Sequence, residues 1–459
     1  MRRRMSSSGP AALDKAVDEK RTEIYYWWLL LALFFEYARP GSFLPVLDAV
    51  KANSLIPLSL LVLVLFTSGF RSFKQIFADN QARWLTAFLG LVLVSVPFAP
   101  VSLRAFNTFT LVLGYYFLFL IITRVATSWR RLRGIFVALM AAHAFLIAMT
   151  PDIVTNTVVR SYIEGGTFLG DGNDFALSLC ILVPLAIEVA LGARLQVVRI
   201  VAWLAVLLFL MAIVGSQSRG ATLGIASVGV FLWLLSQRKF ASLLGIALLG
   251  AIMIFHASDA YFQRMSTIEN YQEDGSAQGR IMVWKASTRM ALDNPILGVG
   301  AGNFPIAFGT RYRPPEVVGP LPWLTAHSSY FLVLGEMGLP GIISFLAIVA
   351  GGFNSTMAVR RRVLREGGAS QREGTTARTL YLLCAGLLGF AVAGAFLSAA
   401  YYPHIFVLTG LLIAARSIAN AELAAPATQA QELSGPVLRR RPRGVRRRTR
   451  VRTIRGSGT

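Results

Sequence analysis

The chain has 459 residues, of which 55% are hydrophobic and only 15% are charged, and its formal net charge is +22. A soluble protein carries roughly a quarter charged residues, so this composition excludes an ordinary soluble domain. The positive charge lies at the ends of apolar blocks and in the two tails, without the aromatic or fold signals of a nucleic-acid-binding protein. We therefore expect a membrane protein with no nucleic-acid partner.

Successive apolar blocks follow one another along the whole chain. With their apolar flanks they approach the roughly 17 to 25 residues that cross a hydrocarbon core about 30 Å thick. The pattern predicts an all-α polytopic membrane protein with about 12 transmembrane helices. The blocks are residues 24–38, 53–69, 84–99, 105–123, 134–150, 173–191, 200–215, 220–236, 241–256, 328–351, 379–399 and 403–418.

The short loops between these blocks predict their orientation, because Lys and Arg favour loops on the cytoplasmic side. Counted from a cytoplasmic N-terminus, every second loop is basic, and the alternate loops are poor in basic residues. The basic loops lie at residues 71–83, 124–133, 194–199, 238–239 and 360–365. We expect both termini in the cytoplasm of a bacterial cell, the helices in its inner membrane, and any active site on the periplasmic face.

The chain divides into five predicted parts. These are a cytoplasmic leader (1–23), transmembrane helices 1–9 (24–256), a large periplasmic loop with an amphipathic helix (257–326), transmembrane helices 10–12 (327–418) and a basic cytoplasmic tail (419–459). We expect the tail to rest on anionic lipid headgroups, at about 1 kcal/mol per basic residue near the surface. Cys180 and Cys384 lie inside apolar blocks and read as small packing residues, with no disulfide framework.

The predicted amphipathic helix has the sequence GRIMVWKASTRMALDN. Helical spacing brings four of its residues to one face. These residues are Arg280, Trp284, Ser287 and Ala291. Lys285 and Arg289 are expected on its solvated side.

Three arginines on the predicted outer side are candidates for binding a diphosphate, because the planar guanidinium donates two parallel hydrogen bonds to phosphate oxygens. Arg219 lies in a very short turn of small residues, where a bulky headgroup has room; the alternative is an arginine that snorkels at the end of a span. Arg280 lies on the amphipathic helix, and Arg160 lies in the glycine-rich segment 151–173. For both, the alternative is an ordinary solvated charge.

His327 lies at the outer mouth of the tenth predicted span. A neutral imidazole there can take a proton from an attacking hydroxyl, and the alternative is a packing residue. His143 and His256 are expected to be packing or interfacial residues, and His404 is a secondary candidate in another outer turn. Since no His, Cys and Asp cluster has the spacing of metal ligands, we predict no metal and no cofactor.

Two acidic residues, Glu188 and Glu336, lie within predicted spans. A carboxylate in the membrane is costly unless it is paired or protonated, so we expect both to face the interior of the bundle. Proton coupling in a transporter is one interpretation of these residues. A structural hydrogen bond or ion pair is the interpretation that we favour.

Three segments together resemble the O-antigen ligase and polymerase superfamily, over about residues 150–350. These segments are SQSRGATLG (216–224), SAQGRIMVWKASTRMALDNPILGVGAGNF (276–304) and AHSSYFLVLGEMGLPG (326–341). The opening segment at 25–50 is similar to the O-glycosylation ligase branch of that superfamily. Its members are membrane enzymes that use glycans linked to polyprenyl diphosphate.

The resemblance implies metal-independent glycosyl transfer at the periplasmic face, in the synthesis of lipopolysaccharide or another surface polysaccharide. The donor would be a glycan on a polyprenyl diphosphate such as undecaprenyl diphosphate. Arg219 and Arg280, with Arg160, would hold the diphosphate, and His327 would activate the acceptor hydroxyl or assist the leaving group. One departure is the sequence His-Ser-Ser-Tyr at 327–330, where many members have Asn after the histidine.

Several alternatives stay open at this point. The acceptor could be the lipid A core, a growing polysaccharide or a protein hydroxyl; the last would make the chain a protein O-oligosaccharyltransferase of the same superfamily. A transporter or lipid flippase would depend on Glu188 and Glu336 and would not need His327. No internal inverted repeat supports that class. A purely structural membrane protein would leave the arginines of the outer face unexplained.

Overall fold

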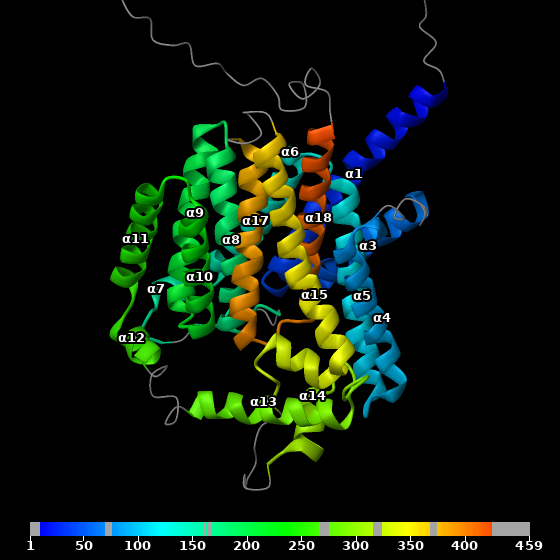
Figure 1. Cartoon of the computed structure of the whole chain (residues 1–459), viewed down its shortest axis with the longest axis vertical. Helices are drawn as coiled ribbons and strands as arrows, with labels where there is room; N and C mark the ends of the chain where they lie inside the picture. Colours follow the sequence, from blue (N-terminus) through cyan, green and yellow to red (C-terminus); the bar gives the residue numbers. More distant parts are fainter. Residues whose placement is uncertain are drawn as a thin grey trace, which may run out of the picture.

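The computed structural model describes residues 10–68, 76–159, 161–163, 168–266, 275–314, 324–367 and 374–424. Within these ranges every regular element is a helix and no strand occurs (Figure 1). The predicted all-α polytopic fold is therefore confirmed.

The long helices form the bundle, except α13, which lies across one of its ends. They are α1 (Pro10–Ala38), α3 (Ala52–Ser68), α4 (Asn80–Ser95), α5 (Ser102–Val125), α6 (Trp129–Met149), α8 (Gly172–Gly192), α9 (Gln196–Gly215), α10 (Arg219–Leu235), α11 (Lys239–His256), α13 (Gly275–Asp293), α15 (Ser329–Glu366), α17 (Thr375–Ala393) and α18 (Pro403–Ala424). The short elements are η1 (Pro40–Ser42), α2 (Pro45–Ala49), η3 (Val96–Phe98), α7 (Asp152–Thr155), α12 (Asp259–Ser266), α14 (Phe304–Ala307), η4 (Phe308–Tyr312) and η5 (Gly394–Phe396).

Each of the twelve predicted apolar blocks falls mainly within a helix. In the described part of the chain, nine helices are long and apolar enough to cross a membrane, and α3 and α10 contain shorter apolar helices at Ala52–Val64 and Arg219–Leu235. The first block lies in α1, which begins at Pro10, well before the predicted start at residue 24. The number of twelve spans stays a prediction.

The ends of several helices are fixed by side-chain caps. Helices α4, α6, α8, α10 and α15 each begin after a Ser or Asp whose side chain accepts a hydrogen bond from a backbone N–H of the first turn. The capping residues are Asp79, Ser128, Asp171, Ser218 and Ser328. These polar residues therefore define where the helices begin. Arg219 directly follows the cap Ser218, and His327 directly precedes the cap Ser328.

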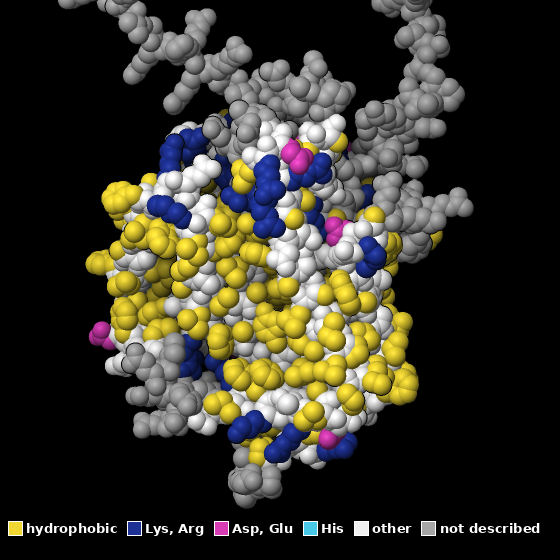
Figure 2. All heavy atoms as spheres, in the orientation of Figure 1, with side chains coloured by type: hydrophobic (Ala, Val, Ile, Leu, Met, Phe, Trp, Pro, Cys, Tyr) yellow, Lys and Arg dark blue, Asp and Glu magenta, His cyan; other side chains and the backbone are white. Residues whose placement is uncertain are grey.

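Most of the long helices run roughly parallel to one another, and α8 packs against α6, α9, α10 and α17 (Figure 1). Of the most apolar part of α8, 83% is buried inside the protein, whereas none of the corresponding part of α11 is buried. On the face shown in Figure 2, a wide band of hydrophobic side chains separates two groups of Lys and Arg. This distribution is the one expected of a protein that is surrounded by lipid at mid-height.

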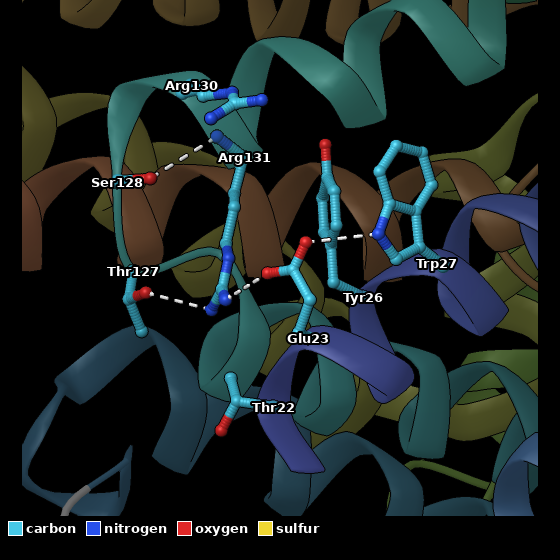
Figure 3. A pocket seen from close by; sticks show the side chains of 8 residues that line it. All are labelled: Thr22, Glu23, Tyr26, Trp27, Thr127, Ser128, Arg130 and Arg131. Carbon is cyan, nitrogen blue, oxygen red and sulfur yellow. Dashed lines mark hydrogen bonds and ion pairs between the residues drawn. The ribbon is translucent and has the colours of Figure 1, made fainter. Parts of the chain in front are cut away.

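The predicted inner loops gather at one end of the bundle, which we call the basic end. There the end of α18 meets the start of α4, since Arg416 Nη2 lies 2.7 Å from Asp79 Oδ2. The end of α8 meets the starts of α6 and α17 through ion pairs of Glu188. A pocket between α1 and the turn from α5 to α6 also opens at this end (Figure 3).

The opposite end of the bundle is covered by α13, and we call it the α13 end. The starts of α8 and α18 meet there, because Tyr402 Oη donates to Asp174 Oδ2 at 3.1 Å. The start of α15 meets the end of α17, because Ser329 Oγ donates to the carbonyl of Leu397 at 2.7 Å. The helices thus alternate in direction as the loop charges predict. The assignment of this end to the periplasm stays a prediction.

Glu336 holds the glycine-rich loop after α13 against a kink in α15. Its carboxylate accepts hydrogen bonds from the backbone N–H groups of Gly302 and Phe304, at 2.8 and 2.7 Å. The kink is at Gly338, whose φ of 63° is left-handed and favours glycine. The Leu339 N–H beside it donates to the carbonyl of Pro295 at 2.8 Å. These contacts support the structural interpretation of Glu336 over proton coupling.

Gly338→Ala should lower the free energy of unfolding by about 1–3 kcal/mol, because a side chain in the left-handed region is strained. The added Cβ would also lie 2.4 Å from the carbonyl oxygen of Pro295. Unfolding of the purified protein in detergent measures the effect. The matched control is Gly351→Ala in the same helix, where an added Cβ has nothing within 4 Å. Equal stability of the two variants would contradict the kink's role.

Candidate functional site

Helix α13 lies across the end of the bundle, nearly at right angles to the other helices (Figure 1). Two side chains attach it to the start of α15. Trp284 Nε1 donates to the carbonyl of Ala326 at 3.0 Å, and its ring stacks on Phe331 at 5.0 Å between centroids. Ser287 Oγ donates to the carbonyl of Phe331. The predicted stretch forms a helix, and two residues of its predicted face, Trp284 and Ser287, meet the bundle.

Arg280 lies one helical turn before Trp284 on that face. Its guanidinium carbon is 6.0 Å from the centroid of the Phe396 ring. Phe396 ends η5, which follows α17, so Arg280 reaches a segment more than a hundred positions later in the chain. Lys285 and Arg289 on the same helix are exposed, as predicted. Arg280 is therefore the basic residue that α13 directs toward the bundle.

Arg219 is the first residue of α10, directly after the cap Ser218. The backbone beside it contacts the same segment, because a Cβ added to Gly220 would lie 3.0 Å from Cβ of Phe396. Thr222, one turn into α10, shares a hydrogen bond of 2.9 Å with Tyr261 of α12. The first turn of α10 is thus enclosed between η5 and α12, and Gly220 leaves space for that close approach.

The turn between α9 and α10 also holds the loop after α7. Gln217 Nε2 donates to the carbonyls of Thr157 and Val158, at 2.8 and 3.2 Å. Ser258 Oγ donates to the same carbonyl of Thr157 at 2.5 Å. The neighbours of Arg160 therefore lie against the turn that carries Arg219. Arg160 itself lies outside the described residues, so its role stays a prediction.

His327 comes two residues before α15 and has a φ of 48°, in the left-handed region. The residues on both sides of it are tied to the segment after η5. Thr325 Oγ1 donates to Ser398 Oγ at 3.1 Å, and Ser329 Oγ donates to the carbonyl of Leu397 and accepts from the N–H of Ala399. These contacts fix the backbone that presents the imidazole.

The stretches of chain that carry the three predicted residues thus lie against one short segment, residues 394–398. Arg280 contacts it directly, Arg219 is next to a residue that contacts it, and His327 is flanked by residues that bind it. Tyr402, which follows this segment by four residues, makes a further polar contact. Burial and the nearby Asp174 carboxylate raise the pKa of Tyr402, so its phenol stays protonated and donates to Asp174.

The segment 394–398 was not predicted as part of a site. The apolar pattern places residues 379–399 in one span, but α17 ends at Ala393 and the chain turns through η5 toward the site. Gly394, near the end of this apolar block, is the signal that could have indicated the turn. His404, the secondary candidate, is buried in the first turn of α18 and has its Nδ1 3.2 Å from Tyr37 Oη.

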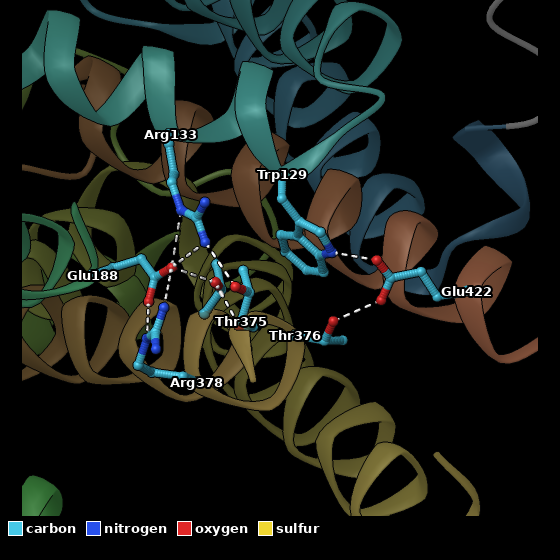
Figure 4. A network of polar contacts seen from close by, with 8 residues as sticks. Trp129, Arg133, Glu188, Thr375, Thr376, Arg378 and Glu422 are labelled. Carbon is cyan, nitrogen blue, oxygen red and sulfur yellow. Dashed lines mark hydrogen bonds and ion pairs between the residues drawn. The ribbon is translucent and has the colours of Figure 1, made fainter. Parts of the chain in front are cut away.

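Glu188 belongs to a polar network at the opposite, basic end of the bundle (Figure 4). Its side chain is fully buried and lies 3.2 Å from Arg133 Nη2 and 2.7 Å from Arg378 Nε. It also accepts a hydrogen bond of 2.8 Å from Thr379 Oγ1. Neighbouring Glu422 accepts from Trp129 and Thr376. Glu188 is paired inside the bundle, as expected, and it lies away from Arg219, Arg280 and His327.

The described residues contain no group of three or more His, Cys, Asp or Glu that could hold a metal ion. What residues 219, 280 and 327 offer is instead two guanidinium groups and an imidazole at the end of an apolar bundle. Such a set can bind a phosphate-containing anion and exchange one proton with a bound hydroxyl.

Comparison with known proteins gives one family. Residues 204–346 match the family model described as O-antigen ligase, which confirms the resemblance over that stretch. The stretch contains Arg219, Arg280 and His327, whereas Arg160 and residues 394–398 lie outside it. No curated protein matches the chain. The match and the membrane helices together support a membrane function of the O-antigen ligase or polymerase type.

Proposed function

We propose that this chain is a metal-independent glycosyltransferase that moves a glycan from a polyprenyl-diphosphate carrier onto an acceptor hydroxyl at the periplasmic face of the inner membrane. The observation that carries the proposal is the meeting of the α10 start, Arg280 and the chain around His327 at residues 394–398. All three candidate residues come from the stretch that matches O-antigen ligase.

The diphosphate of the carrier binds between Arg219 and Arg280 in this proposal. Arg219 stands at the N-terminus of α10, where the helix dipole already favours an anion. Arg280 approaches from α13, with its guanidinium over the ring of Phe396. Two fixed guanidinium groups stabilise the negative charge that grows on the diphosphate as it leaves, which is the main electrostatic task of the reaction.

His327 accepts the proton of the acceptor in this proposal. The acceptor oxygen attacks the anomeric carbon of the glycan and forms the new glycosidic bond. The bond between that carbon and the phosphate oxygen breaks, and the diphosphate leaves on its polyprenyl chain. The proton of the acceptor hydroxyl passes to the imidazole. The fixed backbone around His327 keeps the imidazole in one place while the two substrates bind.

The contacts of the two intramembrane acids favour this function over a proton-coupled transporter. Glu336 is occupied by two backbone N–H groups, and Glu188 is occupied by two arginines and a threonine. A carboxylate that carries protons during transport has to change its partners, whereas both of these acids hold helices together.

Deletion of the gene in its own host tests the function. We expect one of three pools to lose its glycan: lipopolysaccharide, free or capsular polysaccharide, or glycosylated protein. The pool that changes identifies the acceptor. Complementation with the wild-type chain should restore it, and His327→Ala should reduce transfer by about 10²- to 10⁴-fold, the usual contribution of a general base.

The matched control is His256→Ala, a histidine at the end of α11 on the same side of the bundle and outside the site. It should restore the glycan as the wild type does, and both variants should insert at wild-type level. Three unchanged pools after deletion would overturn glycosyl transfer. Full restoration by His327→Ala would overturn the role of the histidine.

A further inference from the structure

The pocket at the basic end lies at the end of the bundle opposite the proposed transfer site, and Figure 3 shows the residues that line it. It has a volume of about 510 Å³ and lies between α1 and the turn that joins α5 to α6. It is lined by Thr22, Glu23, Tyr26, Trp27, Thr127, Ser128, Arg130 and Arg131. Nothing in the proposed transfer reaction uses these residues.

One arginine of the pocket is paired, and the other is not paired with any residue that the structure describes. Arg131 Nη2 lies 2.7 Å from Glu23 Oε2, and its guanidinium lies over the Tyr26 ring at 5.6 Å. The second oxygen of Glu23 accepts from Trp27 Nε1 at 3.0 Å. Arg130 is exposed and contributes its charge without such a partner. The pocket lining therefore carries one net positive charge, with two arginines against one glutamate.

The position of the pocket matches the boundary between lipid and water. Tyr and Trp gather at that level in membrane proteins because their rings are apolar and carry one polar group. Below the pocket, α1 continues into the apolar block that begins at Ile24. Ile24, Trp27 and Leu31 lie at helical spacing and are exposed, at 57%, 60% and 37%. An acyl chain can lie along this stripe while a headgroup occupies the pocket.

We propose that this pocket binds the phosphate headgroup of an anionic glycerophospholipid, with Arg130 as its principal contact. Basic pockets between helices on the cytoplasmic side are suited to such headgroups. The paired Arg131 and Glu23 shape the wall, and the ring of Tyr26 keeps the Arg131 guanidinium in place. Because the apolar stripe continues from the pocket, a lipid satisfies the site better than a free phosphate ion does.

Titration of the purified full-length chain in detergent with phosphatidylglycerol, followed by native mass spectrometry, tests the proposal. Arg130→Gln should weaken the tightest binding by about fivefold, which corresponds to about 1 kcal/mol for one basic residue near the surface. Arg199→Gln is the matched control, an exposed arginine in the first turn of α9 at the same end of the bundle. It should bind phosphatidylglycerol as the wild type does.

Two further measurements separate a lipid from its alternatives. Phosphatidylcholine, which has the same acyl chains and no net charge, should bind to the wild type at least fivefold more weakly than phosphatidylglycerol does. Inorganic phosphate at equal concentration should not displace phosphatidylglycerol. Equal binding by the wild type, Arg130→Gln and Arg199→Gln would overturn the site, and displacement by inorganic phosphate would overturn the lipid as its ligand.

Discussion

Arg280→Ala should slow glycan transfer by about 10²- to 10³-fold, the loss that follows removal of one fixed donor to a developing anion. The guanidinium of Arg280 is held over Phe396, and Trp284 and Ser287 fix the helix that carries it. It therefore does not have to be ordered when the diphosphate arrives. The rate constant kcat, measured with purified enzyme, a polyprenyl-diphosphate-linked glycan and the identified acceptor, is the quantity that should fall.

Helix α13 itself supplies the control for this prediction. Arg289→Ala removes the same side chain from an exposed position of the same helix and should leave kcat within about twofold, since surface substitutions have small effects. Arg280→Lys should recover only part of the rate, because an ammonium is a point charge and cannot donate the paired hydrogen bonds of a guanidinium. Equal rates for Arg280→Ala and Arg289→Ala would contradict a role for Arg280 in glycan transfer.

Arg219→Ala extends the same prediction to the arginine at the start of α10. If both arginines stabilise one diphosphate, the double variant should lose less rate than the product of the two single losses, because groups that act as a unit are not additive. Independent, multiplicative losses would instead indicate that the two arginines bind different groups. A kinetic cycle of the four proteins decides between these outcomes.

The membrane fold and part of the site follow from patterns within short stretches of sequence. The helical period brings Arg280, Trp284 and Ser287 to one face, and α13 uses that face to meet the bundle. The alternation of basic and non-basic loops predicts which helix ends lie on the same side of the membrane. The structure brings those same helix ends together at the basic end. Each of these features depends on residues close together in the chain, or on the fact that successive spans alternate in direction so that every second loop lies on the same side.

The meeting of these residues at positions 394–398 could not be predicted in this way. Contacts such as those of Thr325 with Ser398 and of Arg280 with Phe396 join distant parts of the chain. Hydropathy alone also continues the span to residue 399, because Gly394, Ala395 and Phe396 are as acceptable in a membrane helix as in η5. Packing decides where α17 ends, and packing is a property of the whole bundle.

Glu188→Gln should destabilise the protein by about 3 kcal/mol, near the low end of the cost of breaking a buried ion pair. The substitution keeps the side-chain volume but leaves Arg133 and Arg378 without their counter-ion. Both arginines are about a quarter exposed, at 24% and 26%, whereas Glu188 is fully buried. Partial hydration of the arginines therefore limits the loss. Unfolding of the purified protein in detergent measures it.

An exposed pair provides the control for Glu188→Gln. Glu366 lies 2.7 Å from Arg362 one turn away on α15, and both side chains are 56% exposed. Glu366→Gln should therefore change stability by no more than about 0.5 kcal/mol. Transfer activity per folded molecule should stay at the wild-type level in Glu188→Gln, because Glu188 holds together the end of the bundle opposite the proposed site. A variant of normal stability that has lost its activity would return Glu188 to the proton-coupled interpretation.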